Sequence, residues 1–130
     1  QEPNWIHVKA RKENICFQKE ALINLAEKFI PEKYTKIAWL DHDIMFTNQN
    51  WYDDISTALD IVKIVQVFET CFWCDSSGKV MHAHEALLRD MPFKEEHITN
   101  NPKPNVTPGF GYAARRDVWR VANGLWPFNF

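Results

Sequence analysis

Two aspartates, Asp41 and Asp43, follow directly on a short apolar run and have the spacing of a shared cation site. The run, residues 37–40, is rich in β-branched and aromatic side chains, which predicts a buried strand. Ligands of open α/β sheets bind beyond the carboxyl ends of strands, and residues two apart in extended backbone point to the same side. Carboxylates held that close repel each other unless a cation or a donor lies between them. We therefore expect a site for a hard divalent ion, Mg²⁺ or Mn²⁺, at these residues; solvated turn acids are the alternative.

The segments around the acids alternate between strand and helix patterns. A short strand is predicted at residues 4–8, and apolar residues at helical spacing predict a helix over residues 15–29. With the strand before the acids, this order implies a parallel pair joined by a right-handed crossover. A helix over residues 51–59 and a buried strand at residues 61–68 continue the alternation. The expected fold class is therefore an α/β sheet covered by helices.

The middle of the chain has weaker patterns. The turn signal at residues 75–78 predicts a hairpin between residues 67–73 and 79–82. Residues 83–89 are expected to form one or two helical turns. Residues 100–105 are rich in Asn and Pro and are expected to form a loop, which in a compact domain is often a binding loop.

A glycine-flanked aromatic residue marks the start of the last segment. Gly109 and Gly111 stand on either side of Phe110, and glycine permits close backbone approach or a positive φ. Residues 115–123 then predict a short helix closed by Gly124. Its arginines are expected on a solvated face, and its inward side chains are expected to be Val118, Val121 and Ala122.

Histidines and cysteines supply secondary candidates for a metal or redox site. His82 and His84 lie two residues apart, so they would share one face of a strand, and a histidine such as these or His97 can complete a manganese site. Cys71 and Cys74 have the Cys-x-x-Cys spacing of redox and zinc sites, although zinc usually needs a second ligand pair. Surface histidines and semi-buried apolar thiols are the simpler interpretation.

Composition limits the possible partners and compartment. The chain has 130 residues, 45% of them hydrophobic and 25% charged, which suits one globular domain. A formal charge of -2 gives no field that would gather nucleic acid. No stretch approaches the roughly 18 apolar residues of a membrane span. The three cysteines, Cys16, Cys71 and Cys74, are too few for a disulfide framework, so we expect a reducing, cytoplasmic setting.

Three segments, which follow one another along the chain in the family's order, resemble nucleotide-sugar glycosyltransferases of the GT-A fold, in their family-2-like and galactosyltransferase-like members. Asp41-His42-Asp43 after a hydrophobic strand resembles the Asp-x-Asp motif of those enzymes. The segment Phe17–Asn24 resembles the helix before that motif, where a basic residue and an Asn recur. Pro108–Arg116, with Gly124–Trp126, is similar to the Gly-rich strand, small-residue turn and helix that follow. The likeness spans roughly residues 13–126.

The resemblance implies a Rossmann-like GT-A sheet with flanking helices, present as a single, partial domain over residues 1–130. Such an enzyme moves a sugar from a UDP- or GDP-sugar to an acceptor hydroxyl, here that of a glycan, and Mn²⁺ or Mg²⁺ stabilises the departing diphosphate. By this likeness Asp43 binds the ion directly, and Asp41 meets the ribose or a metal-bound water. Lys19 and Asn24 would contact the nucleotide. The donor sugar would be bordered by the main chain of Gly109, Phe110 and Gly111.

Two parts of such an enzyme are not found in this sequence. The residues before Trp5 are too few for the strand and loop that hold the base, and the general base is expected beyond Phe130. We therefore expect a partial sequence that need not be active by itself. Two other functions stay open. One is a haloacid-dehalogenase-type phosphatase with Asp41 as nucleophile, although Met45 replaces the usual Thr or Val. The other is a non-catalytic sugar-binding or structural module on the same fold.

Overall fold

The computed structural model describes residues 5–9, 11, 19–87, 106–107 and 109–125. The chain is mixed α/β and divides into two compact units, one formed by residues 1–37 and 114–130 and the other by residues 38–113. Among the described helices, none combines the length and the apolar character that a membrane crossing requires.

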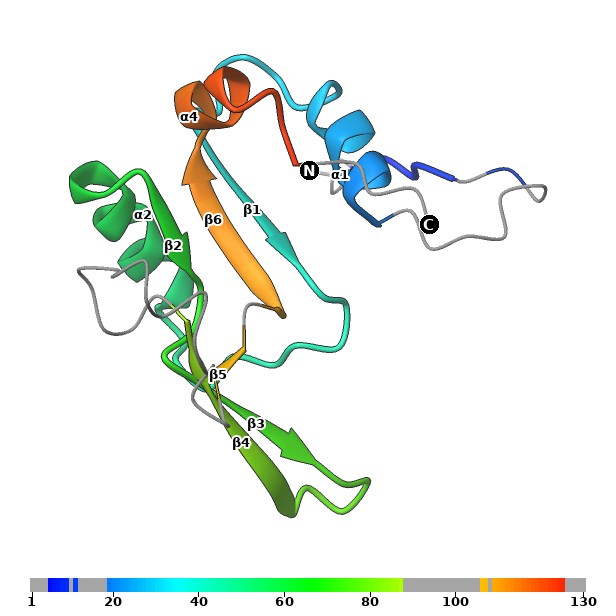
Figure 1. The fold of residues 1–130 in the computed structure, drawn as a ribbon, viewed down its shortest axis with the longest axis vertical. Coiled ribbons are helices and arrows are strands. Elements are labelled where there is room, and N and C mark those ends of the chain that lie inside the picture. The colour runs from blue at the N-terminus through cyan, green and yellow to red at the C-terminus, as the bar shows by residue number, and fades with distance from the viewer. Residues whose placement is uncertain (1–4, 10, 12–18, 88–105, 108, 126–130) are drawn as a thin grey trace, which may run out of the picture. The chain divides into compact units, whose positions relative to one another are not determined.

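A three-stranded sheet carries the acid pair at one end of its first strand (Figure 1). Strand β6 (Gly111–Arg115) lies between β1 (Lys36–Leu40) and β2 (Ile64–Gln66). Strands β1 and β6 are antiparallel: the Asp41 N–H donates to Phe110 O at 2.9 Å, and the Arg116 N–H donates to Thr35 O at 2.8 Å. The strand predicted before the acids and the strand predicted in the Gly-rich segment are therefore confirmed, and they are neighbours.

Small residues allow β6 to occupy the centre of this sheet. A Cβ atom at Gly111 would lie 2.7 Å from Leu40 Cδ2 and 2.8 Å from Val67 Cγ2, closer than real side chains approach. Ala113 and Ala114 are almost fully buried. The glycine is thus required by packing between β1 and the end of β2, because any side chain would push its neighbours apart.

The core of this unit forms where helix α2 (Trp51–Ile61) packs along β2. Leu59, Val67 and Ala113 are its buried centre, and Leu59 is only 1% exposed. The partly buried side chains around this centre are Leu40, Phe46, Ile55, Val65 and Phe68. The helix predicted over residues 51–59 is confirmed. The strand predicted at residues 61–68 is shorter than expected, because α2 continues to Ile61.

A second sheet contains the predicted hairpin. Strands β3 (Thr70–Cys74) and β4 (Val80–Ala86) pair antiparallel, and β5 (Val106–Thr107) pairs parallel to β4. The turn between β3 and β4 is fixed by Asp75, whose Oδ1 accepts the N–H groups of Ser77 at 2.8 Å and Lys79 at 3.1 Å. The helical turns predicted over residues 83–89 are wrong for residues 83–86. These residues belong to β4, and their backbone groups pair with β3 and β5 instead.

The other unit contains helices α1 (Lys19–Glu27) and α4 (Arg116–Val121). The strand predicted at residues 4–8 is wrong for residues 5–8, which have no regular structure, so they form no parallel pair with β1. The expected loop at residues 100–105, His97 and Cys16 lie outside the described residues.

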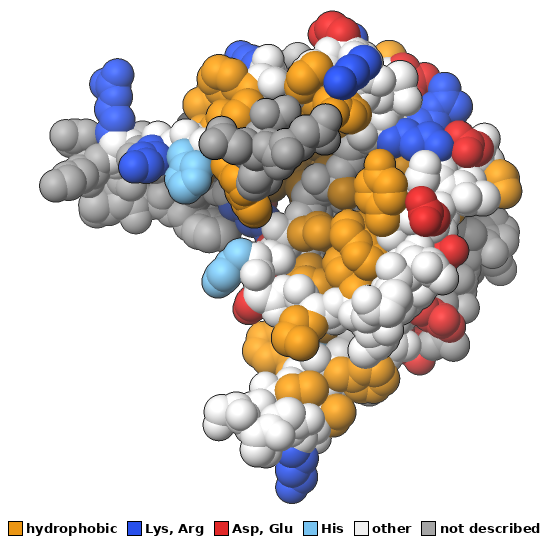
Figure 2. Space-filling view, turned by 180° about the vertical axis from the view of Figure 1, so that it is seen from behind, with side chains coloured by type: hydrophobic (Ala, Val, Ile, Leu, Met, Phe, Trp, Pro, Cys, Tyr) orange, Lys and Arg blue, Asp and Glu red, His pale blue; other side chains and the backbone are white. Residues whose placement is uncertain are grey.

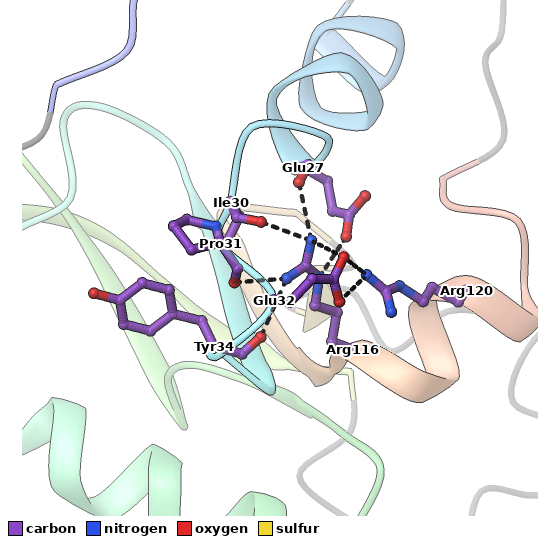
Figure 3. Close-up of polar contacts among 7 residues, drawn as sticks. All are labelled: Glu27, Ile30, Pro31, Glu32, Tyr34, Arg116 and Arg120. Carbon is purple, nitrogen blue, oxygen red and sulfur yellow. Dashed lines mark hydrogen bonds and ion pairs between the residues drawn. The ribbon is translucent and has the colours of Figure 1, made fainter.

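Arg116 connects the end of α1 to the start of α4 (Figure 3). The residue is 5% exposed, and its Nε donates to Glu27 Oε1 at 2.6 Å. Its terminal nitrogens donate to the carbonyl oxygens of Ile30 at 2.9 Å, Pro31 at 2.8 Å and Tyr34 at 3.4 Å. Carbonyl groups just past a helix end lack N–H partners within the helix. The Arg116 guanidinium donates hydrogen bonds to these carbonyl groups instead. The predicted solvated position of the helix arginines is wrong for Arg116, which is a buried cap.

The remaining contacts of α4 define its ends. Arg120 is exposed and holds Glu32 by two hydrogen bonds of 2.7 and 2.8 Å, which lower the pKa of that carboxyl group. Asn123 and Gly124 have positive φ, and the Gly124 N–H reaches back to Trp119 O, as in a Schellman motif. Trp119 is buried, whereas Val121 is 90% exposed. The inward face predicted for this helix is therefore wrong at Val121 and at Ala122, which is also exposed, whereas Val118 is half-buried.

The Arg116 cap predicts a large stability difference between neighbouring arginines. Arg116→Met leaves the Glu27 carboxylate and several carbonyl groups without their donor, so we expect the free energy of unfolding to fall by about 3–5 kcal/mol. The exposed Arg120→Met variant is the matched control and should change stability far less. Urea unfolding followed by circular dichroism measures both; equal losses in the two variants would contradict the capping role.

Candidate functional site

The acid pair lies directly past the end of β1, beside the glycine-flanked turn. Asp41 is half-buried and Asp43 is exposed. The Asp41 N–H donates to Phe110 O at 2.9 Å, so the backbone of Asp41 is held against the turn formed by Gly109, Phe110 and Gly111. The structure thus brings together two groups of residues that the sequence separates widely and that we predicted separately as the metal site and the border of the donor sugar.

Phe110 has a backbone conformation that a bulky residue rarely adopts. Its φ is +71°, and the Gly111 N–H donates to Gly109 O at 3.0 Å across it, which defines a γ-turn of the rare positive-φ type. The left-handed region costs a residue with a Cβ about 1–2 kcal/mol. Strain of this kind persists only where neighbouring contacts over-determine the backbone, and it is concentrated at functional sites.

Gln66 is one of the groups that hold this turn. Its Nε2 donates to Thr107 O at 2.9 Å and to Gly109 O at 3.3 Å, while the Gly109 N–H donates to Thr107 Oγ1 at 3.1 Å. Sequence reasoning missed Gln66. The available signal was an uncharged polar side chain between the apolar residues Val65 and Val67, which is costly to bury unless that side chain has a specific partner.

The side chain of Phe110 belongs to a cluster of aromatic rings that we call the Phe110 cluster, formed with Phe68, Trp73 and His84. The ring centroid of Phe110 lies 5.8 Å from that of Phe68, 5.9 Å from that of Trp73 and 6.3 Å from that of His84. Trp73 and His84 are themselves 6.1 Å apart. Tilted and edge-on pairs at such spacings are attractive beyond the area they bury. The strained turn is therefore held by two interactions of Phe110. Its carbonyl accepts the Asp41 N–H, and its ring contacts the hairpin residues Trp73 and His84.

One face of the hairpin carries the histidines and one cysteine. Cys71 is opposite His84, and Trp73 is opposite His82, and directly opposed residues share a face of the sheet. The predicted common face of the two histidines is confirmed. No group of three or more His, Cys, Asp or Glu side chains that could hold a metal occurs in the described part of the chain. Any ion at Asp41 and Asp43 would complete its coordination there with waters and ligand oxygens, as Mg²⁺ and Mn²⁺ commonly do.

Asp43 exerts its charge on the hairpin. The pKa of the Cys71 thiol is raised, first by burial and then by the charge of Asp43, with a smaller effect of Cys74. Both thiols are free. Residues three apart on a strand are about 10 Å apart, more than the roughly 7 Å that a disulfide spans. The spacing of Cys71 and Cys74 on β3 therefore does not support a redox pair. The half-buried Cys71 agrees with the simpler interpretation, whereas Cys74 is exposed.

Lys19 and Asn24, the predicted nucleotide contacts, belong to the other unit. Lys19 is the first residue of α1. The Asn24 side chain donates to Leu125 O at 2.6 Å and accepts the Leu125 N–H at 2.8 Å. A Cβ at Gly124 would collide with Asn24 Oδ1. Both ends of the Asn24 amide thus join α1 to the chain after α4, and a nucleotide contact of Lys19 or Asn24 stays a prediction from the motif.

Comparisons with protein-family profiles, with curated proteins and with solved structures find no match for this chain.

The strained turn predicts an unusual order of stability for two substitutions of one residue. Phe110→Gly and Phe110→Ala both remove the ring, but only glycine relieves the positive φ. We expect the glycine variant to be more stable by about 1 kcal/mol. At Phe68, which lacks a positive φ, the alanine variant should be the more stable of the two. Thermal and urea unfolding measure these differences, and an alanine variant that matches the glycine variant at Phe110 would refute the strain.

The link between Asp43 and Cys71 predicts a change in thiol reactivity. Asp43→Asn removes a charge that raises the pKa of Cys71, so that pKa should fall and the thiol should react faster with iodoacetamide at a given pH. The pH dependence of the alkylation rate, measured with Cys16 and Cys74 changed to Ser, gives the pKa. Asp53→Asn, an exposed acid in the first turn of α2, is the control and should leave the rate unchanged. An unchanged profile in Asp43→Asn would place its carboxylate too far from β3 to act.

Proposed function

We propose that this chain is part of a metal-dependent glycosyltransferase of the GT-A type, which moves a sugar from a UDP- or GDP-sugar to an acceptor hydroxyl of a glycan. The observation that carries the proposal is the hydrogen bond from the Asp41 N–H to Phe110 O. It supports a donor site in which the acid pair and the glycine-flanked turn act on one ligand. No contact among the described residues favours the phosphatase alternative in the same way.

The donor set suits a divalent ion that arrives with a diphosphate. Asp43 is exposed at the end of β1 and would bind Mn²⁺ or Mg²⁺ directly, while the half-buried Asp41 would hold the ribose or a metal-bound water. Such an ion, when bound, acts as a Lewis acid that stabilises negative charge on the departing diphosphate. Two carboxylates leave coordination positions for diphosphate oxygens, so ion and nucleotide should bind together.

The glycine-flanked turn would position the sugar. The Phe110 carbonyl accepts the Asp41 N–H, so the turn is tied to the backbone of the first acid. Gly109 has room for a side chain, whereas Gly111 does not, and the main chain between them can approach a ligand closely. In this arrangement the protein orients the donor sugar. Holding two bound substrates in the reactive geometry contributes a large part of the rate acceleration in such a transfer.

The proposal extends to groups that the described site does not include. Lys19 and Asn24 are kept as nucleotide contacts because of the helix motif. The setting is proposed to be cytoplasmic, in agreement with the free thiols of Cys71 and Cys74.

A sugar-binding module without chemistry is the second candidate, because the indole of Trp73 is half exposed beside the site. Metal dependence separates the two. A transferase descendant should bind nucleoside diphosphate only with Mn²⁺ or Mg²⁺, whereas a binding module should bind free sugar and ignore the nucleotide.

The decisive variant is Asp43→Ala. Isothermal titration with UDP and with GDP in the presence of Mn²⁺ should show weak binding to the chain, and the variant should lose at least about tenfold in affinity because a direct ligand of the ion is gone. Asp53→Ala, which removes another exposed acid, in α2, should bind like the parent chain. Circular dichroism must show the same fold in all three. Equal binding by Asp43→Ala would remove the metal-site claim.

A further inference from the structure

Trp73 is half exposed although its ring contacts two other rings. It lies within the Phe110 cluster, with its ring centroid 5.9 Å from that of Phe110 and 6.1 Å from that of His84, yet 52% of the residue is exposed. Hydrophobic side chains reach the surface along the hairpin, at the bottom of Figure 2. An indole held by two rings and open to solvent elsewhere is a fixed apolar surface, so binding to it would cost little side-chain entropy.

The position of Trp73 relative to the proposed donor site follows from Phe110, which contacts both. Phe110 accepts the Asp41 N–H through its main chain and meets Trp73 and His84 through its ring. The residue keeps a strained φ of +71° while making both contacts. Trp73 is therefore linked to the backbone of Asp41 through a single residue, and that residue belongs to the turn that would border the donor sugar.

The two substrates of a transfer must meet with their reacting atoms in contact, so the acceptor has to lie next to the donor sugar. The indole of Trp73, beside the glycine-flanked turn, is placed to contact the acceptor. The nucleobase would be separated from the sugar by the diphosphate, and hence by the ion at Asp41 and Asp43. A pyranose has an apolar C–H face that packs on an indole, and its hydroxyl groups need polar partners at the edge, which His82 and His84 offer on the same hairpin face.

We propose that the exposed face of Trp73 is the subsite for a pyranose ring of a saccharide acceptor, an inference that rests on the proposed transferase function. The adjacent Phe72 is equally exposed, at 56%, but consecutive strand residues point to opposite faces, so it belongs to the other side of the hairpin.

The test is binding of three β-linked disaccharides, lactose, cellobiose and N,N′-diacetylchitobiose, to the whole chain. Saturation-transfer NMR and titration of tryptophan fluorescence should detect binding of at least one of them. Trp73→Ala should weaken that binding by about tenfold, the loss of one aromatic contact. Trp73→Phe, which keeps an aromatic face and guards against misfolding, should recover most of it. Phe72→Ala is the matched control and should bind like the parent chain.

Several results would overturn the subsite. They are a parent chain that binds none of the three disaccharides, equal losses in Trp73→Ala and Phe72→Ala, or no loss in Trp73→Ala. A Trp73→Ala variant that loses Mn²⁺-dependent UDP or GDP binding, but not disaccharide binding, would assign the indole to the nucleobase instead.

The same titrations separate this inference from the proposed function. If the parent chain binds a disaccharide through Trp73 but never binds UDP or GDP with Mn²⁺, the transferase proposal fails and the saccharide surface remains. If nucleotide binding is present and depends on Asp43 while Trp73→Ala changes nothing, the transferase proposal stands and the acceptor subsite fails.

Discussion

One backbone hydrogen bond, from the Asp41 N–H to Phe110 O, is the constraint on which the site depends. It is the last rung of the antiparallel pairing of β1 and β6, and it fixes where the acid pair begins relative to the glycine-flanked turn. Phe110 offers that carbonyl while its φ is positive. The strain is compensated by the buried core beneath, where Gly111 packs between Leu40 and Val67, and by the rings that hold Phe110.

Local patterns were sufficient to predict the elements closest to the acids. The apolar run before Asp41 could be recognised as a strand because its composition and its charged boundary leave few alternatives. The helix after the acids has a regular inward stripe, and the Asp75 turn has a side chain that binds its own backbone. In each case the physical cause of the structure is contained within a few neighbouring residues, so the sequence alone displays it.

The failures concern structure that depends on distant partners. Residues 83–86 have helical propensity, yet they form a strand because their backbone groups find partners in β3 and β5. Arg116 was expected in solvent, and only the fold shows that the end of α1 presents carbonyl groups to it. The contact of Asp41 with Phe110 and the grouping of Trp73 with His84 likewise could not be inferred, since neither has any local sequence signature.

The central claim is that Asp41 and Asp43 hold a divalent ion against the turn at Phe110. Paramagnetic Mn²⁺ tests it most directly, because it broadens the backbone amide signals of residues near the ion in a ¹⁵N-resolved NMR spectrum. With substoichiometric Mn²⁺ and excess UDP, the account predicts selective broadening at Asp41, Asp43 and Phe110. Broadening centred on the α2 acids, Asp53 and Asp54, or spread evenly over the exposed carboxylates, would contradict it.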